Sequence, residues 1–595
     1  MGMEKDPLPQ LEDWRRDGRI APLDAHFGRF VARGSGHAAL GLLAAVVSRQ
    51  RSLGHVCLDA RQLPEDLPGP ELEAAWRAVR SLDSPWLGRG PGAWSPLVLD
   101  GARLYLGRMH AAECRVAGAL RRRLEAPDLP PPRPEHIRAL FPGDGPGIDG
   151  QRLAAVIAAL RPFALITGGP GTGKTTTVLR VLALRLLRQP ELAIHLLAPT
   201  GKAAARLTES LRAQRSSLAV PGLDPARIPD RVSTVHHFLG LGRGRPRYDR
   251  RHPAPVDLVV LDEASMIDLP TMDRLLEALP ETAGLLLLGD PHQLASVEAG
   301  SVLADLVEGA DPRAFSPAMQ ARLRALGVPL PEGTASGSRA DDALVALTWS
   351  HRFPPDRGIG KLAAAVRSGT ASWEEVEAIA AQHPEIELLT WQGKRLPPGW
   401  LDGFVEPLDN RTCTNLPSAL RHLGRARVLC ALRSGPAGVE TLNQVVAERL
   451  AAKRGGQPSL HGTPVLVTRN APALGLYNGD MGVLWAHETA TGERRVRACF
   501  LGPDGEIHCL PRAELPEHEP AYALTVHKSQ GSEYDRVLLV LPDTPHPLVT
   551  RELLYTALTR ARRAVRILAG PETWDAGVNR RTQRASGLTE RLRAR

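Results

Sequence analysis

Apolar positions along this chain recur in two patterns, short continuous runs of strand length and longer stretches with helical periodicity. Eight apolar runs of strand length lie at 163–167, 194–198, 258–261, 285–288, 428–432, 464–468, 537–541 and 565–568. Helical patterns separate these runs, and such alternation is typical of parallel sheets covered by helices. The pattern predicts an α/β fold with two domains of this kind, which we place at 151–360 and 361–595.

The pattern changes at three other places. Residues 1–125 show helical periodicity with short apolar runs, which predicts a mainly helical N-terminal domain. Proline and glycine crowd 126–150 on both sides of one short helical segment, as in a linker. Residues 461–517 carry short strands and hairpin signals at Asn478-Gly479-Asp480 and Pro503-Asp504-Gly505, which predict a small β-barrel-like insertion within the second domain.

Composition narrows the class of protein only slightly. The 595 residues carry a net charge of +9, which suits a basic groove as well as an ordinary solvated surface. Six scattered cysteines without a C-x-x-C pair indicate reduced thiols and argue against a disulfide framework, a zinc site or an iron–sulfur site. The N-terminus lacks an apolar signal core, and the run 38–47 is too short to span a bilayer. We expect a cytoplasmic protein with no membrane partner.

A glycine-rich loop is the most informative motif. It reads G-G-P-G-T-G-K-T-T-T and lies between an apolar run and a helical pattern. Its spacing predicts a phosphate-binding loop, in which Lys174 reaches the outer phosphates of ATP and Thr175 holds Mg²⁺. A glycine-rich turn that binds nothing is the alternative, but the strand before and the helix after favour the phosphate loop. The residues expected to contact the nucleotide are Gly168, Gly169, Pro170, Gly171, Thr172, Gly173, Lys174, Thr175 and Thr176.

Polar residues also follow two later apolar runs. Asp262 and Glu263 end the run V-V-L, where the first carboxylate can order Mg²⁺ and the second can orient the attacking water. Alone, this pair would indicate an exposed strand end, but its position after a phosphate loop favours catalysis. Gln293 follows the next run in L-L-G-D-P-H-Q-L, and it can sense the terminal phosphate because ligands bind at the carboxyl ends of parallel strands.

Two further turns can contact nucleic acid. The segment A-P-T-G-K-A-A-A-R-L offers Thr200 and Lys202 to a strand phosphate, with an ordinary capped helix as the alternative. The segment T-V-H-K-S-Q-G-S-E offers Thr525, His527 and Lys528, of which the histidine is expected to hydrogen-bond or stack, since it has no partners at metal-ligand spacing.

Two arginines can complete a nucleotide site. Arg352 in S-H-R-F and Arg560 in Y-T-A-L-T-R-A-R can each supply a guanidinium to the γ-phosphoryl group from downstream of the phosphate loop. An ordinary surface arginine remains the alternative for both.

Taken in order, seven segments resemble the motifs of superfamily 1 DNA helicases. Their wording is similar to that of the RecD family, the alpha subunits of exodeoxyribonuclease V, above all in D-E-A-S-M-I-D-L-P, D-P-H-Q-L-A-S-V-E-A-G and A-L-G-L-Y-N-G-D-M-G. The resemblance implies two RecA-like domains with an SH3-like insertion in the second. It further implies an ATP-dependent helicase that moves 5′ to 3′ along single-stranded DNA and unwinds duplex DNA ends for double-strand break repair.

The resemblance also implies roles for partners and residues. The N-terminal domain would dock onto partners in a heterotrimer with RecB-like and RecC-like subunits. A partner would carry the nuclease, because no acidic cluster here is followed by a suitably placed lysine. Residues 240–253 lie where the family has a small hairpin beside the DNA channel. The resemblance implies that Gln151 contacts adenine and that Gln293, Arg352 and Arg560 contact the γ-phosphate. It places Gly531 and Glu533 near the ribose.

One departure and two rival hypotheses stand beside this interpretation. Gly150 precedes Gln151, whereas an aromatic residue often does so in the family, which makes adenine preference less secure than phosphate binding. One rival is a stand-alone helicase of the longer RecD-like branch. The other is a P-loop ATPase that serves as a regulatory or assembly switch and never translocates.

Overall fold

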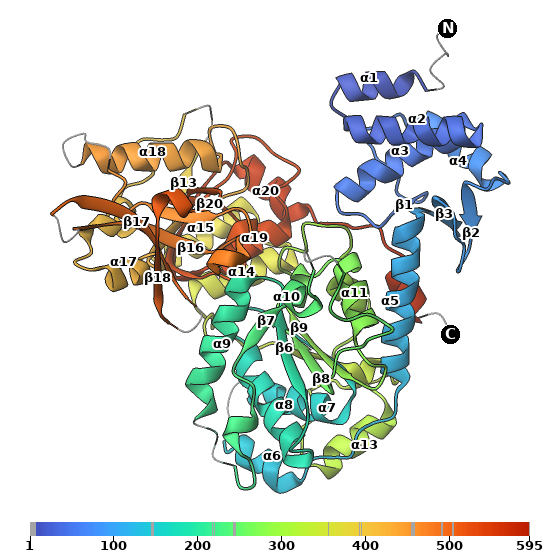
Figure 1. Ribbon diagram of the computed structural model, residues 1–595, viewed down its shortest axis with the longest axis horizontal. Coiled ribbons are helices and arrows are strands. Elements are labelled where there is room, and N and C mark those ends of the chain that lie inside the picture. The colour runs from blue at the N-terminus through green and yellow to red at the C-terminus, as the bar shows by residue number, and fades with distance from the viewer. Residues whose placement is uncertain are drawn as a thin grey trace.

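The computed structural model describes residues 8–143, 148–216, 218, 220–241, 245–354, 356–391, 393, 395–453, 459–488, 492–502 and 505–593. An N-terminal domain, a first α/β domain and a second α/β domain lie beside one another (Figure 1). Helix α5 (Gly107–Glu125) leads from the N-terminal domain down the side of the first α/β domain. In the described part of the chain, no helix is both long and apolar enough to cross a membrane.

The N-terminal domain contains four helices and a small sheet. The helices are α1 (Gln10–Arg16), α2 (Pro22–Ser35), α3 (Ala38–Ser52) and α4 (Gly69–Arg80). Helices α2 and α3 pack closely at Gly28 and Gly41, which have no side chain. A Cβ at either position would lie within 2.8 Å of the other glycine's carbonyl oxygen. The strands β1 (Cys57–Asp59), β2 (Leu87–Arg89), β3 (Leu97–Asp100) and β4 (Arg103–Leu106) pair in the order β1-β4-β3-β2. Periodicity did not predict this sheet, because its strands are only three or four residues long.

The first α/β domain is built on a six-stranded parallel sheet in the order β12-β5-β9-β8-β6-β7. Its strands are β5 (Phe163–Gly168), β6 (Ile194–Ala198), β7 (Val232–Thr234), β8 (Leu258–Leu261), β9 (Gly284–Gly289) and β12 (Leu344–Leu347). Its helices are α6 (Pro134–Leu140), α7 (Ile148–Leu160), α8 (Lys174–Arg188), α9 (Gly201–Arg215), α10 (Val235–Leu239), α11 (Leu269–Ala278), α12 (Val302–Val307) and α13 (Pro317–Ala325).

Both faces of this sheet are covered, which explains its continuous apolar strands. Along β9, Leu285 and Leu287 pack into one apolar cluster with α5 and α11, while Leu286 and Leu288 pack into another with α7 and α8. Side chains alternate across a strand, so burial on both faces requires an apolar residue at every position. The predicted α/β fold with parallel sheets is confirmed.

The second α/β domain has a five-stranded parallel sheet in the order β13-β22-β21-β14-β20. Its strands are β13 (Ile386–Thr390), β14 (Ala426–Cys430), β20 (Ala523–Thr525), β21 (Tyr534–Val540) and β22 (Ala561–Ala569). Its helices are α14 (Gly358–Ser368), α15 (Trp373–Gln382), α16 (Val405–Leu408), α17 (Leu416–His422), α18 (Val439–Ala452), α19 (Arg551–Leu558) and α20 (Pro571–Asn579).

An antiparallel sheet interrupts this second domain where the insertion was expected. Its strands are β15 (Pro464–Val467), β16 (Met481–Glu488), β17 (Arg494–Leu501), β18 (Ile507–Pro511) and β19 (His518–Pro520), paired in the order β18-β17-β16-β15-β19. The hairpin signal at Asn478-Gly479-Asp480 precedes β16, and Gly479 has a φ of 97°. Of the second hairpin signal, residues 503 and 504 lie outside the described residues.

The expectation of reduced cysteines is wrong for one pair. Cys499 and Cys509 lie directly opposite each other on β17 and β18, with a Cα–Cα distance of 4.1 Å, and form a disulfide. The other four cysteines are free. A strand register brings this pair together, and register is not visible in cysteine spacing alone.

Two longer segments connect the strands of the first α/β domain. In 240–253, the described residues contain no strand, and Asp249 and His252 exchange backbone hydrogen bonds in a tight turn; residues 242–244 lie outside the described residues. In 308–339, the chain forms α13 and a short parallel pair, β10 (Ala314–Phe315) and β11 (Ala335–Ser336).

The last residues of the chain leave the second domain. After α20, residues 580–593, here called the C-terminal strap, run beside α5 and end in helix α21 (Leu588–Arg593) (Figure 1). Within the strap, Arg584 donates hydrogen bonds to carbonyl oxygens of Glu298 and Gly300 in the first α/β domain. The backbone of Ala585 bonds to both His55 and Val56 of the N-terminal domain. All three domains are therefore joined by this strap.

Candidate nucleotide-binding site

The glycine-rich loop joins β5 to α8 and curls around its own lysine. Gly171 and Gly173 have φ angles of 78° and 84°, a region that residues with a Cβ rarely occupy. The Lys174 ammonium group donates hydrogen bonds to the carbonyl oxygens of Gly168 and Gly169, at 2.5 Å and 3.1 Å. Because α8 begins at Lys174, the positive end of this helix faces the loop, which favours an anion there.

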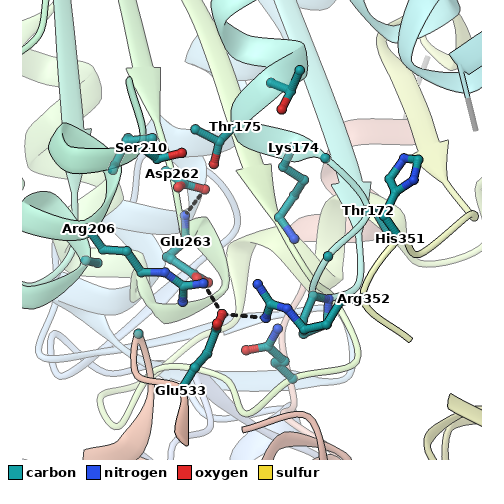
Figure 2. Close-up of a pocket in the computed structure, with 18 of the residues that line it drawn as sticks. Thr172, Lys174, Thr175, Arg206, Ser210, Asp262, Glu263, His351, Arg352 and Glu533 are labelled. Atoms are coloured by element: carbon teal, nitrogen blue, oxygen red, sulfur yellow. Dashed lines mark hydrogen bonds and ion pairs between the residues drawn. The ribbon is translucent and has the colours of Figure 1, made fainter. Parts of the chain in front are cut away.

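A cavity of about 480 Å³ opens beside this loop, between the two α/β domains. Figure 2 shows the side chains that surround it. The first domain contributes the loop residues 170–176 together with Ala203, Arg206, Leu207, Ser210, Gln214, Asp262, Glu263, Gln293, His351 and Arg352, and the second contributes Gly531, Glu533 and Arg560. Residues separated by almost 400 positions therefore line one cavity.

The acidic pair lies at the end of β8 in this cavity. Asp262 accepts a hydrogen bond from the backbone N–H of Glu263 at 2.9 Å. Glu263 has a φ of 51°, and among the described residues it alone combines a side chain with a positive φ. Such strain persists where the surrounding structure imposes it, often at functional sites. Burial and the adjacent Glu263 charge raise the pKa of Asp262 to about 6.

The oxygen ligands of this cavity suit Mg²⁺. The Thr175 hydroxyl and the Asp262 carboxylate both line it, and Mg²⁺ prefers such hard oxygen donors together with substrate phosphates. In the described part of the chain, this cavity included, no group of three or more His, Cys, Asp or Glu residues is arranged to hold a metal ion.

A hydrogen bond joins the two domains across the cleft. The Gln293 side chain accepts from the Arg560 guanidinium at 2.8 Å and donates to Asp290 at 3.0 Å. Arg560 also donates to the carbonyl oxygens of Thr556 and Ser532 at 3.1 Å and 3.2 Å, so its orientation is fixed. The predicted γ-phosphate sensors of the two domains are therefore in direct contact.

Leu294, the residue after Gln293, forms two more hydrogen bonds across the cleft. The backbone N–H of Leu294 donates to the Thr556 hydroxyl at 2.9 Å, and its carbonyl oxygen accepts from the Gln530 side chain at 2.8 Å. Both partners belong to the second domain. The turn after β9 is thus attached to the second domain at two consecutive residues, Gln293 and Leu294.

Three arginines form ion pairs with Glu533, which lines the cavity. Its carboxylate, only 5% exposed, forms ion pairs with Arg352 at 2.5 Å, Arg562 at 3.1 Å and Arg206. Figure 2 shows Arg206 and Arg352 reaching this carboxylate from opposite sides. Burial and the neighbouring guanidinium groups lower the pKa of Arg352 to about 10. One carboxylate faces three cations, which leaves positive charge beside the phosphate loop.

Gln151 touches the loop without lining the cavity. It lies on α7, where its amide donates to the Thr172 carbonyl oxygen at 3.3 Å and accepts from Arg180 at 2.8 Å. Its nitrogen is also 3.4 Å from Nε2 of His351, which does line the cavity. The role of Gln151 in recognising adenine stays a prediction.

The predicted DNA contacts of the first domain lie at the start of α9. Thr200 accepts a hydrogen bond from the backbone N–H of Ala203 at 3.2 Å and so caps this helix. Lys202 is partly buried, and burial lowers its pKa. Its surroundings include Asp480 in the turn before β16, whose charge partly offsets this effect.

The predicted contacts of the second domain lie at the end of β20 and in the turn after it. Thr525 accepts from the backbone N–H of Lys528 at 3.2 Å, and the Lys528 ammonium group pairs with Glu519 at 2.6 Å. Burial and the charge of Arg584 lower the pKa of His527. A role in DNA binding stays a prediction for the residues of both groups.

Sequence reasoning missed Arg206 and Tyr555 at the site, and it missed Arg562, which pairs with Glu533 from outside the cavity. Arg206 and Arg562 meet at Glu533, and Tyr555 lies close to the loop, because a Cβ at Gly169 would be 2.7 Å from its hydroxyl. A signal was present for Arg206, which follows Lys202 by four residues and therefore lies on the same face of one helix. Tyr555 and Arg562 belong to the motif Y-T-A-L-T-R-A-R, in which only Arg560 was predicted to act at the nucleotide.

Models of three protein families match parts of the chain. Residues 16–105 match the RecBCD enzyme subunit RecD, N-terminal domain. Residues 151–299 match an AAA domain, and residues 520–568 match a UvrD-like helicase C-terminal domain. The matches fall on the N-terminal domain and on both α/β domains.

Similar proteins are found over nearly the full length of the chain. The RecBCD enzyme subunit RecD of Mycobacterium tuberculosis is 38% identical over 93% of this chain and 91% of its own length. The corresponding protein of Mycolicibacterium smegmatis is 37% identical over 96% and 98%. The ATP-dependent RecD2 DNA helicase of Deinococcus radiodurans is 31% identical over 83% of this chain and 59% of its own length.

Proposed function

Because the chain belongs to the RecD family, we propose that it is the ATP-driven DNA translocase of a RecBCD-type exodeoxyribonuclease V complex. The chain is an ATP-dependent DNA helicase. One observation supports the motor mechanism above others: the phosphate loop and the acidic pair of one domain face Arg560 of the other, which bonds to Gln293 across the cleft. Hydrolysis at such a seam can drive relative movement of the two domains.

The residues around the cavity divide the chemical work. Lys174 binds the outer phosphates, Thr175 and Asp262 hold Mg²⁺, and Glu263 orients the attacking water. Mg²⁺ bound there neutralises negative charge on the phosphates. Arg560, with Gln293 and Arg352, stabilises the charge that develops on the γ-phosphoryl group.

Closure of the cleft moves one DNA contact relative to the other. Thr200 and Lys202 belong to the first domain, whereas Thr525, His527 and Lys528 belong to the second. Each cycle of closure and opening therefore changes the distance between two contacts on one DNA strand, which advances single-stranded DNA through the protein. Movement is 5′ to 3′, the direction that family membership implies, and unwinding starts at duplex ends.

Family membership also supports the remaining assignments. The antiparallel sheet at 464–520 is the SH3-like insertion of this family. The N-terminal domain, which matches the RecD N-terminal family model, docks onto RecB-like and RecC-like subunits. The nuclease of the complex belongs to a partner subunit.

The test compares ATP hydrolysis by the wild-type chain and by Lys174→Gln, with and without single-stranded DNA. We expect DNA to stimulate the wild type, with a steep loss of stimulation as salt rises, because phosphate contacts release counterions. Lys174→Gln should hydrolyse no ATP above background and still assemble with its partners. Undiminished hydrolysis by this variant would contradict the proposal.

The two rival functions make different predictions in the same experiments. A stand-alone helicase would purify from its host without RecB-like and RecC-like subunits and would unwind DNA alone. A regulatory switch would hydrolyse ATP at the same rate with and without DNA. The match of residues 16–105 to the RecD N-terminal model favours the subunit of a complex.

A further inference from the structure

Helix α9 connects a predicted DNA contact to the nucleotide cavity. The helix begins at Gly201, directly after Thr200, and Lys202 lies in its first turn. One turn later, Arg206 lines the cavity together with Lys174 and the acidic pair. A single rigid element thus presents residues to both predicted ligands.

The partner of Arg206 belongs to the other domain. Its guanidinium pairs with the Glu533 carboxylate, which Arg352 contacts at 2.5 Å from the opposite side (Figure 2). Glu533 is 5% exposed, while the Arg206 side chain is 40% exposed. The carboxylate is therefore shared and enclosed, whereas the guanidinium retains access to the cavity.

The charges in the cavity favour a second anion for Arg206. The charges of Glu263 and Asp262 act on its guanidinium, so the group lies within electrostatic range of the catalytic carboxylates. A guanidinium is planar and binds phosphate as readily as carboxylate, through two parallel N–H donors. Because three guanidinium groups share the one Glu533 carboxylate, their positive charge is not fully neutralised, and a triphosphate supplies the missing negative charge.

We propose that Arg206 is a further catalytic residue of ATP hydrolysis, which exchanges Glu533 for the outer phosphoryl group of ATP and transmits DNA binding at the start of α9 to that group. The proposal rests on the proposed function, since it requires ATP in this cavity and DNA at Thr200 and Lys202. It assigns to α9 the coupling between the two ligands.

A purely structural ion pair between the domains is the competing explanation, and Arg562 provides its control. Arg562 pairs with the same Glu533 carboxylate at 3.1 Å, but its side chain is 51% exposed and does not line the cavity. Arg562→Ala therefore removes an ion pair of Glu533 and leaves the cavity unchanged. Arg206→Ala removes an ion pair and a cavity group together.

The experiment measures steady-state ATP hydrolysis by the purified full chain with saturating oligo(dT) and without DNA. We expect Arg206→Ala to lower the DNA-stimulated kcat by about 100-fold, the effect of removing one transition-state donor. Arg206→Lys should restore little, because an ammonium group cannot reproduce the planar fork. Arg562→Ala should retain DNA stimulation.

Nucleotide affinity provides a second readout that a structural role would not move. Arg206→Ala should bind fluorescent ADP as tightly as the wild type and bind a non-hydrolysable ATP analogue more weakly, because only ATP carries the outer phosphoryl group. A cooperative thermal unfolding transition confirms that each variant is folded. An equal loss of affinity for ADP and for the ATP analogue would contradict the proposal.

Three further outcomes would overturn the role of Arg206. These are wild-type DNA stimulation in Arg206→Ala, equal losses in Arg206→Ala and Arg562→Ala, and full rescue by lysine. Failure of the proposed function looks different, because DNA would then fail to stimulate even the wild type. Lys174→Gln, assayed in parallel, shows that the measured hydrolysis comes from this site.

Discussion

Two seams hold the domains of the molecule together, and both depend on arginine. At the cleft, Arg206 and Arg352 share Glu533, and a cavity separates the walls. At the C-terminal strap, Arg591 pairs with Glu113, which is fully buried on α5 and also accepts bonds from Tyr105 and the backbone N–H of Gly587.

The difference lies in how completely each charge is satisfied. At the strap, Arg584 donates to the Ser296 hydroxyl at 3.0 Å and to the carbonyl oxygens of Glu298 and Gly300 at 2.7 Å and 2.9 Å. Buried charged groups with several hydrogen-bond partners hold a structure together, because removing one partner leaves an uncompensated charge. At the cleft, positive charge remains beside an open cavity, which suits a ligand. Catalysis and stability should therefore separate when each seam is mutated.

Arg560→Lys should produce the largest effect at the cleft. The variant keeps the positive charge but loses the fork that contacts Gln293, Thr556 and Ser532. We expect DNA-stimulated hydrolysis to fall by about 10³-fold, the range found for arginines that stabilise phosphoryl transfer. ATPase assays measure this loss, and thermal unfolding should remain cooperative. A variant with wild-type turnover would show that the cleft bond has no part in hydrolysis.

Arg591→Ala should produce the complementary effect at the strap. It leaves Glu113 buried without its ion-pair partner, which costs about 3–5 kcal/mol in comparable sites. The unfolding midpoint in denaturant should fall, while ATP hydrolysis under folding conditions stays close to that of the wild type. The comparison of the two seams fails if this variant loses hydrolysis without losing stability.

Asp305→Asn should produce a smaller effect that depends on pH. Burial raises the pKa of Asp305, which faces the strap residues Arg584 and Ser586, to about 7. The folded chain therefore binds this proton more tightly than the unfolded chain, so ionisation destabilises the fold as pH rises from about 4 to 7. The asparagine variant should lack this loss and unfold a few degrees above the wild type at pH 8. Equal midpoints for both proteins at pH 8 and pH 4 would contradict this account.

The sequence predicted those features whose causes are local. The strand β9 was predictable because burial on both faces requires apolar residues at every position. The loop was predictable because Gly171 and Gly173 must adopt positive φ. In contrast, the strap carries no apolar run, and its position depends on Glu113, more than 450 residues earlier in the chain.

Contacts between the domains were predictable only in part. Arg560 and Gln293 were each expected at the phosphate, although their direct bond was not. The gathering of three arginines at Glu533 depends on how the domains meet, because its members come from α9, the segment after β12 and β22. The disulfide between Cys499 and Cys509 likewise follows from strand register.

Distances measured by pulsed electron paramagnetic resonance test the central claim. The claim is that nucleotide closes the cleft, while the strap keeps the N-terminal domain and the first α/β domain in a fixed arrangement. One spin-label pair spans the cleft, at the exposed residues Glu209 on α9 and Arg563 on β22. A second pair joins the N-terminal and first α/β domains, at Leu53 and Glu281, in a chain whose partly exposed Cys114 and Cys413 are serine. A non-hydrolysable ATP analogue with single-stranded DNA should shorten the first distance and leave the second unchanged. An unchanged cleft distance would contradict the account.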